Sequence, residues 1–199
     1  ANLISYPLSE CGDIEDVLSG DAQDCLHAIA GEGQSALNIE TGWAGALTAL
    51  CPDKGYWFYN LCEDIEFTYN EPTSLARQME LSPSPYPYNQ SSKQAFYFIE
   101  SVENIDIGDW ILSFNGETVI GAREWQGSTI DVPAMGDDGT DFTEGYMQAG
   151  KIPSLKLLKD GKLIDLEGDI PAFENNQLYM VSSLTEAIPL PEAFSLDRA

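Results

Sequence analysis

All four cysteines of this chain fall within its first 62 residues, at Cys11, Cys25, Cys51 and Cys62. An even, clustered set of cysteines is typical of disulfides formed in an oxidising compartment. Three pairings are open, and we prefer Cys11–Cys25 with Cys51–Cys62, because these bridges close two short loops and contribute about 3 kcal/mol each. A zinc site is the alternative, but no C-x-x-C occurs and His27 is the single histidine. The cysteines therefore predict a disulfide-bonded unit.

That unit is predicted to be a small α+β unit over residues 1–70. Residues 2–8 predict a strand, and residues 13–18 predict a short helix with an acidic first turn that ends at Gly20. Further strands are predicted at residues 26–29, 42–50 and 55–59. Residues 71–92 are predicted to be a proline-rich linker or a long connection along the surface, because their prolines exclude a regular helix or a central strand.

Residues 93–184 predict an antiparallel β-sandwich, which makes the whole chain mainly β. Residues 94–102 are apolar on both alternating faces, as expected for a strand buried on both sides. Asn115-Gly116 and Asp160-Gly161 each predict a tight hairpin, since both turn positions need positive φ. Residues 185–199 form a proline-containing C-terminal tail.

The charge balance excludes several kinds of partner. The chain has 33 acidic and 9 basic residues, for a net charge of −24, which opposes binding to nucleic acid or anionic lipid. No stretch reaches the roughly 20 apolar residues that span a bilayer, so we expect no membrane insertion. The chain opens on Ala1 and an apolar strand, as expected after removal of a signal peptide, although an excised piece of a longer chain would open in the same way. We therefore expect secretion.

An acidic loop is the candidate metal site. Asp137, Asp138, Asp141 and Glu144 would supply the oxygen ligands that calcium prefers. The spacing does not fit the EF-hand pattern, so a solvated Asp-Gly turn is the alternative. No other cofactor is predicted.

The aromatic residues are candidates for a sugar-binding surface. Trp57 and Tyr59 alternate onto one face of a predicted strand, and Trp43 lies on the strand before it. Other aromatic residues that could join such a surface are Tyr56, Phe58, Tyr86, Tyr88, Trp110 and Trp125. Core packing is the alternative role, and only an exposed aromatic row would favour a carbohydrate ligand.

No catalytic residues are assigned, and we expect a protein that is not an enzyme. The chain has one histidine, no G-x-G-x-x-G, no P-loop and no nucleophile elbow. Pairs of carboxylates suited to glycoside hydrolysis arise by chance among so many acids, so they single out no site. A secreted hydrolase is therefore the least favoured alternative.

Several segments resemble secreted bacterial surface proteins. The tail segment Leu190-Pro-Glu-Ala-Phe-Ser-Leu196 resembles the segment that precedes the C-terminal sorting domain in cargo of the type IX secretion system. Gly42-Trp43-Ala-Gly-Ala-Leu47 is similar to part of a small repeated module of such secreted proteins, and Gly121-Ala-Arg-Glu-Trp125 is similar to part of a β domain of the same kind of protein. The resemblance implies an extracellular or cell-surface location and no established reaction.

These features lead to the hypothesis of an extracellular structural subunit that self-associates into a homo-oligomer or polymer, as a filament, sheath or surface layer. Leu190, Phe194 and Leu196 are the candidate assembly residues, together with exposed strand edges that can pair with a second chain. The alternative is a carbohydrate-binding or adhesive module that uses exposed aromatic residues to hold glycans.

Overall fold

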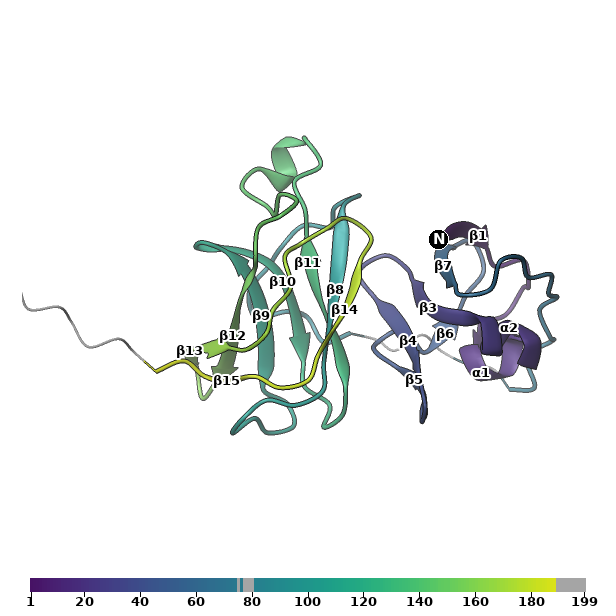
Figure 1. The fold of residues 1–199 in the computed structure, drawn as a ribbon, viewed down its shortest axis with the longest axis horizontal. Coiled ribbons are helices and arrows are strands. Elements are labelled where there is room, and N and C mark those ends of the chain that lie inside the picture. Colours follow the sequence, from purple (N-terminus) through teal and green to yellow (C-terminus); the bar gives the residue numbers. More distant parts are fainter. Residues whose placement is uncertain (75, 77–80, 189–199) are drawn as a thin grey trace, which may run out of the picture.

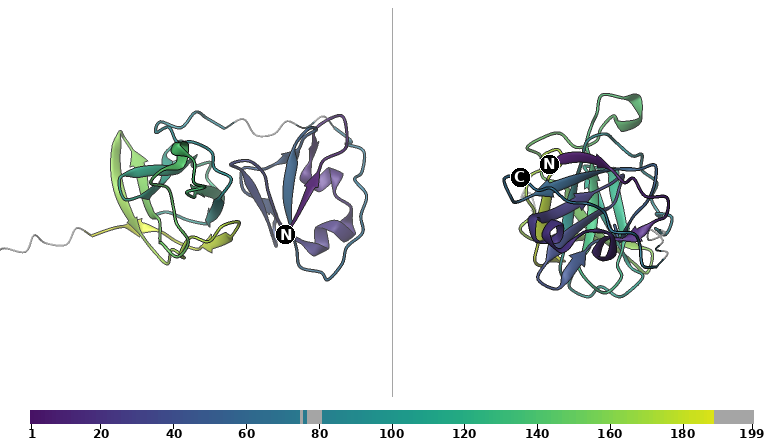
Figure 2. Two further views of the ribbon diagram at one scale, coloured as in Figure 1. Left: turned by 90° about the horizontal axis from the view of Figure 1, so that it is seen from above. Right: turned by 90° about the vertical axis from the view of Figure 1, so that its right-hand side faces the viewer.

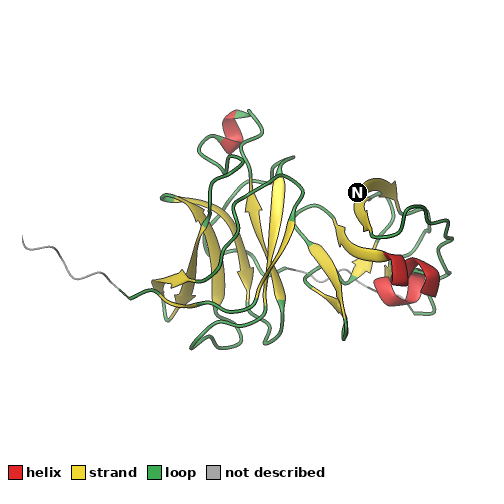
Figure 3. Ribbon diagram, viewed as in Figure 1, coloured by secondary structure: helices red, strands yellow, loops and turns green. Residues whose placement is uncertain are grey.

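The computed structural model describes residues 1–74, 76 and 81–188. Strands dominate these residues, with two short helices and one turn of 3-10 helix (Figure 3), so the predicted mainly β fold is confirmed. We call residues 1–70 the N-terminal unit, residues 93–188 the C-terminal unit and residues 71–92 the connector. Figure 2 shows the two units side by side, with the described residues of the connector along one flank.

The N-terminal unit is built on a five-stranded antiparallel sheet in the order β1-β7-β3-β4-β5. Its strands are β1 (Asn2–Ser5), β3 (Leu26–Ala30), β4 (Ser35–Ile39), β5 (Gly42–Ala44) and β7 (Gly55–Asn60). A separate two-stranded ladder joins β2 (Gly12–Asp13) to β6 (Ala49–Leu50). The single strand predicted over residues 42–50 is therefore two short strands in different sheets.

Two helices, α1 (Ile14–Val17) and α2 (Gly20–Cys25), cover one face of this sheet (Figure 1). The second begins at Gly20, where the sequence predicted that a helix ends. Ser19 explains the difference, because its hydroxyl accepts a hydrogen bond from Ala22 N and so caps a new helix. Among the described residues, no helix is long and apolar enough to cross a membrane.

The disulfides are confirmed, but the predicted pairing is wrong: Cys11 is bonded to Cys51 and Cys25 to Cys62. Strand pairing brings these cysteines together. The β2–β6 ladder sets Cys11 beside Cys51, and the β3–β7 ladder ends with Leu61 N donating to Cys25 O. Strand register, and not loop length, thus determines which cysteines pair. The presence of two disulfides indicates an oxidising setting.

The C-terminal unit packs two sheets around a shared apolar core. One sheet has the order β10-β9-β12-β13-β15, and the other has the order β11-β8-β14. The strands are β8 (Gln94–Ile99), β9 (Trp110–Asn115), β10 (Thr118–Glu124), β11 (Ile130–Met135), β12 (Ser154–Lys159), β13 (Lys162–Glu167), β14 (Leu178–Val181) and β15 (Thr185–Glu186). Their pairing is antiparallel except between β14 and β8, which run parallel. The 3-10 helix η1 (Asp141–Thr143) projects from this unit on a loop (Figure 3).

Both predicted hairpins form, with a one-residue difference in the first. Asp160 and Gly161 lie between β12 and β13 with φ of 51° and 73°, as expected. In the β9–β10 hairpin Asn115 still pairs with Thr118, so the loop is Gly116 with the residue after it. Gly116 alone supplies the positive φ, at 60°.

Strand β8 is buried on both faces, as the sequence predicts, because it lies between the sandwich core and the N-terminal unit. Tyr97 and Ile99 face the sandwich core. Phe96 and Phe98 instead join a cluster with β3 and β4 of the N-terminal unit. Figure 1 shows β8 on the side of the C-terminal unit that faces these strands. The two units therefore share an apolar interface.

A buried ion pair of the C-terminal unit lies at the same interface, and both of its residues form hydrogen bonds to the N-terminal unit. Asp131 on β11 is fully buried and accepts hydrogen bonds from Ser35 N at 2.8 Å and Ala46 N at 2.6 Å, both in the N-terminal unit. Arg123 on β10 lies 3.1 Å from the same carboxylate and donates to Gly33 O at 2.8 Å. Burial raises the pKa of Asp131, and the Arg123 guanidinium with the backbone donors opposes that rise. We call this group the interface ion pair.

Candidate functional site

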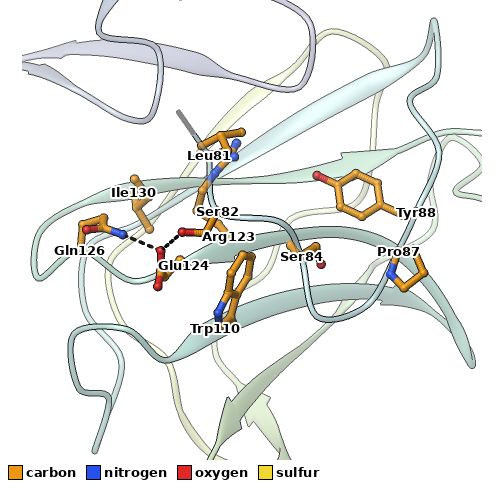
Figure 4. Close-up of a pocket in the computed structure, with 11 residues that line it drawn as sticks. Leu81, Ser82, Ser84, Pro87, Tyr88, Trp110, Arg123, Glu124, Gln126 and Ile130 are labelled. Atoms are coloured by element: carbon orange, nitrogen blue, oxygen red, sulfur yellow. Dashed lines mark hydrogen bonds between the residues drawn. The ribbon is translucent and has the colours of Figure 1, made fainter. Parts of the chain in front are cut away.

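An open pocket of about 580 Å³ lies between the connector and the outer face of β9 and β10 (Figure 4). Its walls combine the aromatic rings of Trp110 and Tyr88 with the side chains of Ser82, Glu124 and Gln126. A concave surface that combines aromatic and apolar walls with convergent polar groups is typical of a small-ligand site. We therefore treat this pocket as the candidate functional site.

Strand pairing places the side chains of Trp110 and Glu124 next to each other. Trp110 and Glu124 are direct partners in the antiparallel β9–β10 ladder, so their side chains lie side by side on one face. The next pair on that face, Leu112 with Ala122, is apolar and packs against Tyr88 from the connector. The Trp110–Glu124 pair thus lies beside the apolar part of this face, which Tyr88 covers.

A β-bulge decides which charge this face carries. The ladder shifts by one residue between Val119 and Gly121, so Ile120 and Gly121 both face the core. A one-residue shift moves every later side chain of the strand to the opposite face of the sheet. Without it, Arg123 would stand opposite Trp110 in place of Glu124. The bulge requires glycine, because a Cβ at residue 121 would lie 1.8 Å from Pro133 O.

The connector forms the opposite wall. Ser84 holds the turn of this segment, since its hydroxyl donates to Tyr86 O at 2.6 Å and accepts from Tyr86 N at 3.2 Å. Ser82 donates to Glu124 Oε2 at 2.5 Å, which fastens the connector to β10. Of the two interpretations of residues 71–92, the described part matches a connection held along the surface.

Hydrogen bonds orient the Glu124 carboxylate. Gln126 Nε2 donates to Oε2 at 3.1 Å, so the two bonds that Glu124 accepts from described residues both fall on this oxygen (Figure 4). Tyr88 lies at the other end of the pocket, and burial raises the pKa of its hydroxyl, which stays protonated at neutral pH. The pocket therefore offers an acceptor at one end and an aromatic hydroxyl at the other.

No family model, no curated protein and no solved structure matches this chain. The assignment of the site rests on its geometry. An indole beside an oriented carboxylate can hold a ring with one apolar face and with hydroxyl or amino groups on its edge.

The aromatic residues predicted to bind a ligand do not form an exposed row. Trp57 and Tyr59 are only partly exposed and pack against the cluster at the interface between the units. Burial raises the pKa of Tyr59 to about 12. Trp43 lies elsewhere, against the N-terminal core beside Ile14 and Leu47. The structure thus keeps Trp57 and Tyr59 together and separates Trp43 from them.

The acidic loop is organised mainly by its own hydrogen bonds. The Asp138 carboxylate accepts from the hydroxyls of Thr143 at 2.7 Å and Thr140 at 2.8 Å, and from Ser92 N at 3.1 Å. Asp137 accepts from the backbone within the loop, while Asp141 lies in η1 and Glu144 directly after it. Among the described residues, no three acidic, histidine or cysteine side chains gather closely enough to hold a metal ion. Calcium binding stays a prediction.

Replacing Asp138 with asparagine should lower the melting temperature at neutral pH, by an amount that shrinks in acid. Its hydrogen bonds from Thr143, Thr140 and Ser92 hold the pKa of Asp138 well below its usual range. A lowered folded-state pKa stabilises the protein above the unfolded pKa of about 4, and this contribution is lost as the pH falls through the folded value. Thermal unfolding at several pH values measures the effect, with Asp141→Asn as the control. A difference that is constant with pH would contradict this account.

Sequence reasoning assigned none of the pocket residues to a site. Trp110 and Tyr88 were named only as possible partners of the other aromatic residues, and Glu124 was one acid among 33. The Ala-Arg-Glu-Trp run at residues 122–125 could have indicated a functional site, because two charged residues interrupt an apolar strand there. Leu190, Phe194 and Leu196, the predicted assembly residues, lie outside the described residues.

Proposed function

We propose that this protein is an extracellular carbohydrate-binding module that holds a sugar ring in the pocket between the connector and β9–β10. The sequence offered such a module as an alternative, but with other aromatic residues. The Trp110–Glu124 pair gives the proposal a specific site in place of a general aromatic surface.

The single observation that carries the proposal is the direct pairing of Trp110 with Glu124 in the wall of the pocket. A sugar ring has an apolar face of C–H groups that can pack on an indole, and edge hydroxyls that donate to a carboxylate. The Ser82 and Gln126 donors hold the carboxylate in place before a ligand arrives. Such preorganisation lowers the entropy cost of binding.

The pocket supports binding better than hydrolysis. Glycosidases ordinarily use two carboxyl groups that flank the scissile bond. Among the described residues that line this pocket, Glu124 is the one carboxylate. Arg123 also lines it, but its guanidinium is taken up by the interface ion pair. We therefore propose a binding function and no reaction.

Glycan-array screening followed by calorimetry tests the proposal. Trp110→Ala should weaken binding by about thirtyfold or more, the usual effect of truncating a central aromatic anchor. Trp43→Ala is the matched control, because it removes a partly exposed tryptophan from the other unit. Equal loss of binding in the two variants, or unchanged binding in Trp110→Ala, would contradict the proposal.

Self-association remains a second proposal, favoured by one edge of the N-terminal sheet. Strand β1 lies at that edge, and Leu3 on it is 62% exposed. An exposed apolar edge can pair with another chain, although the net charge of −24 opposes assembly. The particle mass of the native protein at high concentration distinguishes this proposal from a monomeric binding module.

A further inference from the structure

The charge that a ligand meets in the pocket comes from Glu124. Two charged side chains line the described pocket, Arg123 and Glu124. Arg123 is 3% exposed, and its guanidinium nitrogens donate to Asp131 and to Gly33 O. Its charge is therefore compensated behind the pocket wall, at the interface between the units.

Among the described residues, none compensates the charge of Glu124 in the same way. The donors to Glu124 in the described part of the chain, Ser82 and Gln126, are neutral, so they orient the carboxylate and leave its negative charge in place. The ion pairs formed by the described residues join Arg123, Lys156 and Lys159 to other carboxylates. Because Ser82 and Gln126 both bind Oε2, a ligand donor can approach the other oxygen, Oε1.

A cationic group on the ligand would gain from three features at once. It would form a charge-assisted hydrogen bond with Glu124, which is stronger than a bond from a neutral hydroxyl. The Trp110 ring beside it can add a cation–π contact. The net charge of −24 also favours the approach of cations over anions.

We propose that the pocket prefers a sugar that carries a free, protonated amino group over the same sugar with a hydroxyl or an N-acetyl group. The ring packs on Trp110, and the ammonium group binds Glu124. This inference rests on the proposed function and narrows its ligand class to amino sugars.

Three oligosaccharides with one backbone and linkage provide the test: β-1,4-linked oligomers of glucose, of N-acetylglucosamine and of glucosamine. Calorimetry at about pH 6, where the amine is protonated, should show the glucosamine oligomer binding at least about tenfold more tightly than the other two. At about pH 9.5 the amine is largely neutral and the preference should disappear. Tyr88 stays protonated at that pH, because burial raises its pKa.

Glu124→Gln supplies the specific variant, since it keeps the shape of the side chain and removes its charge. It should abolish the preference for the amine while the glucose oligomer still binds. Glu117→Gln is the control, because Glu117 is exposed in the loop at the far end of the same hairpin and its replacement changes the net charge equally. Near-ultraviolet circular dichroism of both variants checks that they fold.

The outcomes separate the two proposals. Equal binding of the three oligomers, or an equal effect of Glu117→Gln and Glu124→Gln, overturns the preference for amines and leaves the proposed function intact. Failure of all three oligomers to bind overturns this inference, whereas failure of every sugar on the glycan array overturns the proposed function and this inference with it.

Discussion

Removing either disulfide should lower the free energy of unfolding by about 4 kcal/mol, because each closes a long loop in the unfolded chain. The bonded cysteines are 40 residues apart in Cys11–Cys51 and 37 residues apart in Cys25–Cys62. The double variants Cys11→Ala/Cys51→Ala and Cys25→Ala/Cys62→Ala each remove one bridge without leaving a free thiol. Urea unfolding of these variants measures the loss. A loss below about 1 kcal/mol in both would contradict the structure.

A thiol-labelling experiment checks the pairing itself. In the single variant Cys11→Ser, the released thiol should be that of Cys51, and mass spectrometry of the labelled peptides identifies it. Labelling of Cys25 would instead support the pairing that loop length alone suggested, and would show that the β2–β6 ladder is wrong.

Asp131→Ala should destabilise the protein by about 3–5 kcal/mol, because it leaves the Arg123 charge buried without its partner. The Ser35 and Ala46 amides would also lose their acceptor. Since Asp131 accepts two hydrogen bonds from the N-terminal unit, the loss should also appear as looser docking between the two units. Urea unfolding gives the stability, and small-angle scattering reports a larger radius of gyration if the units separate.

Asp165→Ala is the matched control for this variant. Asp165 pairs with Lys156 at 2.7 Å, but its side chain is 67% exposed. Exposed ion pairs contribute about 1 kcal/mol or less. Equal destabilisation by Asp131→Ala and Asp165→Ala would mean that burial of the interface ion pair has no energetic consequence.

Local patterns in the sequence predicted those elements whose structure depends on local chemistry. The apolar run of β8 gave a strand buried on both faces, and Asp160-Gly161 gave a hairpin with both turn residues at positive φ. In both places, side-chain periodicity and turn chemistry agree with the fold. The sequence did not reveal that half of the β8 surface is covered by the N-terminal unit.

Features that depend on long-range register could not be predicted in this way. The disulfide pairing follows from β2 meeting β6, which are far apart in the sequence. The bulge at Gly121 decides whether Arg123 or Glu124 stands opposite Trp110, and it needs a glycine because Pro133 on another strand approaches so closely. The candidate site was missed for the same reason.

The most direct test of the account is an NMR titration that follows the four tryptophan indole N–H signals. The ligand is the tightest-binding of the three oligosaccharides, and Trp→Phe variants assign the signals. The account predicts that the signal of Trp110 shifts to saturation while those of Trp43 and Trp57 stay in place. A shift of Trp43 or Trp57 with no change at Trp110 would contradict it.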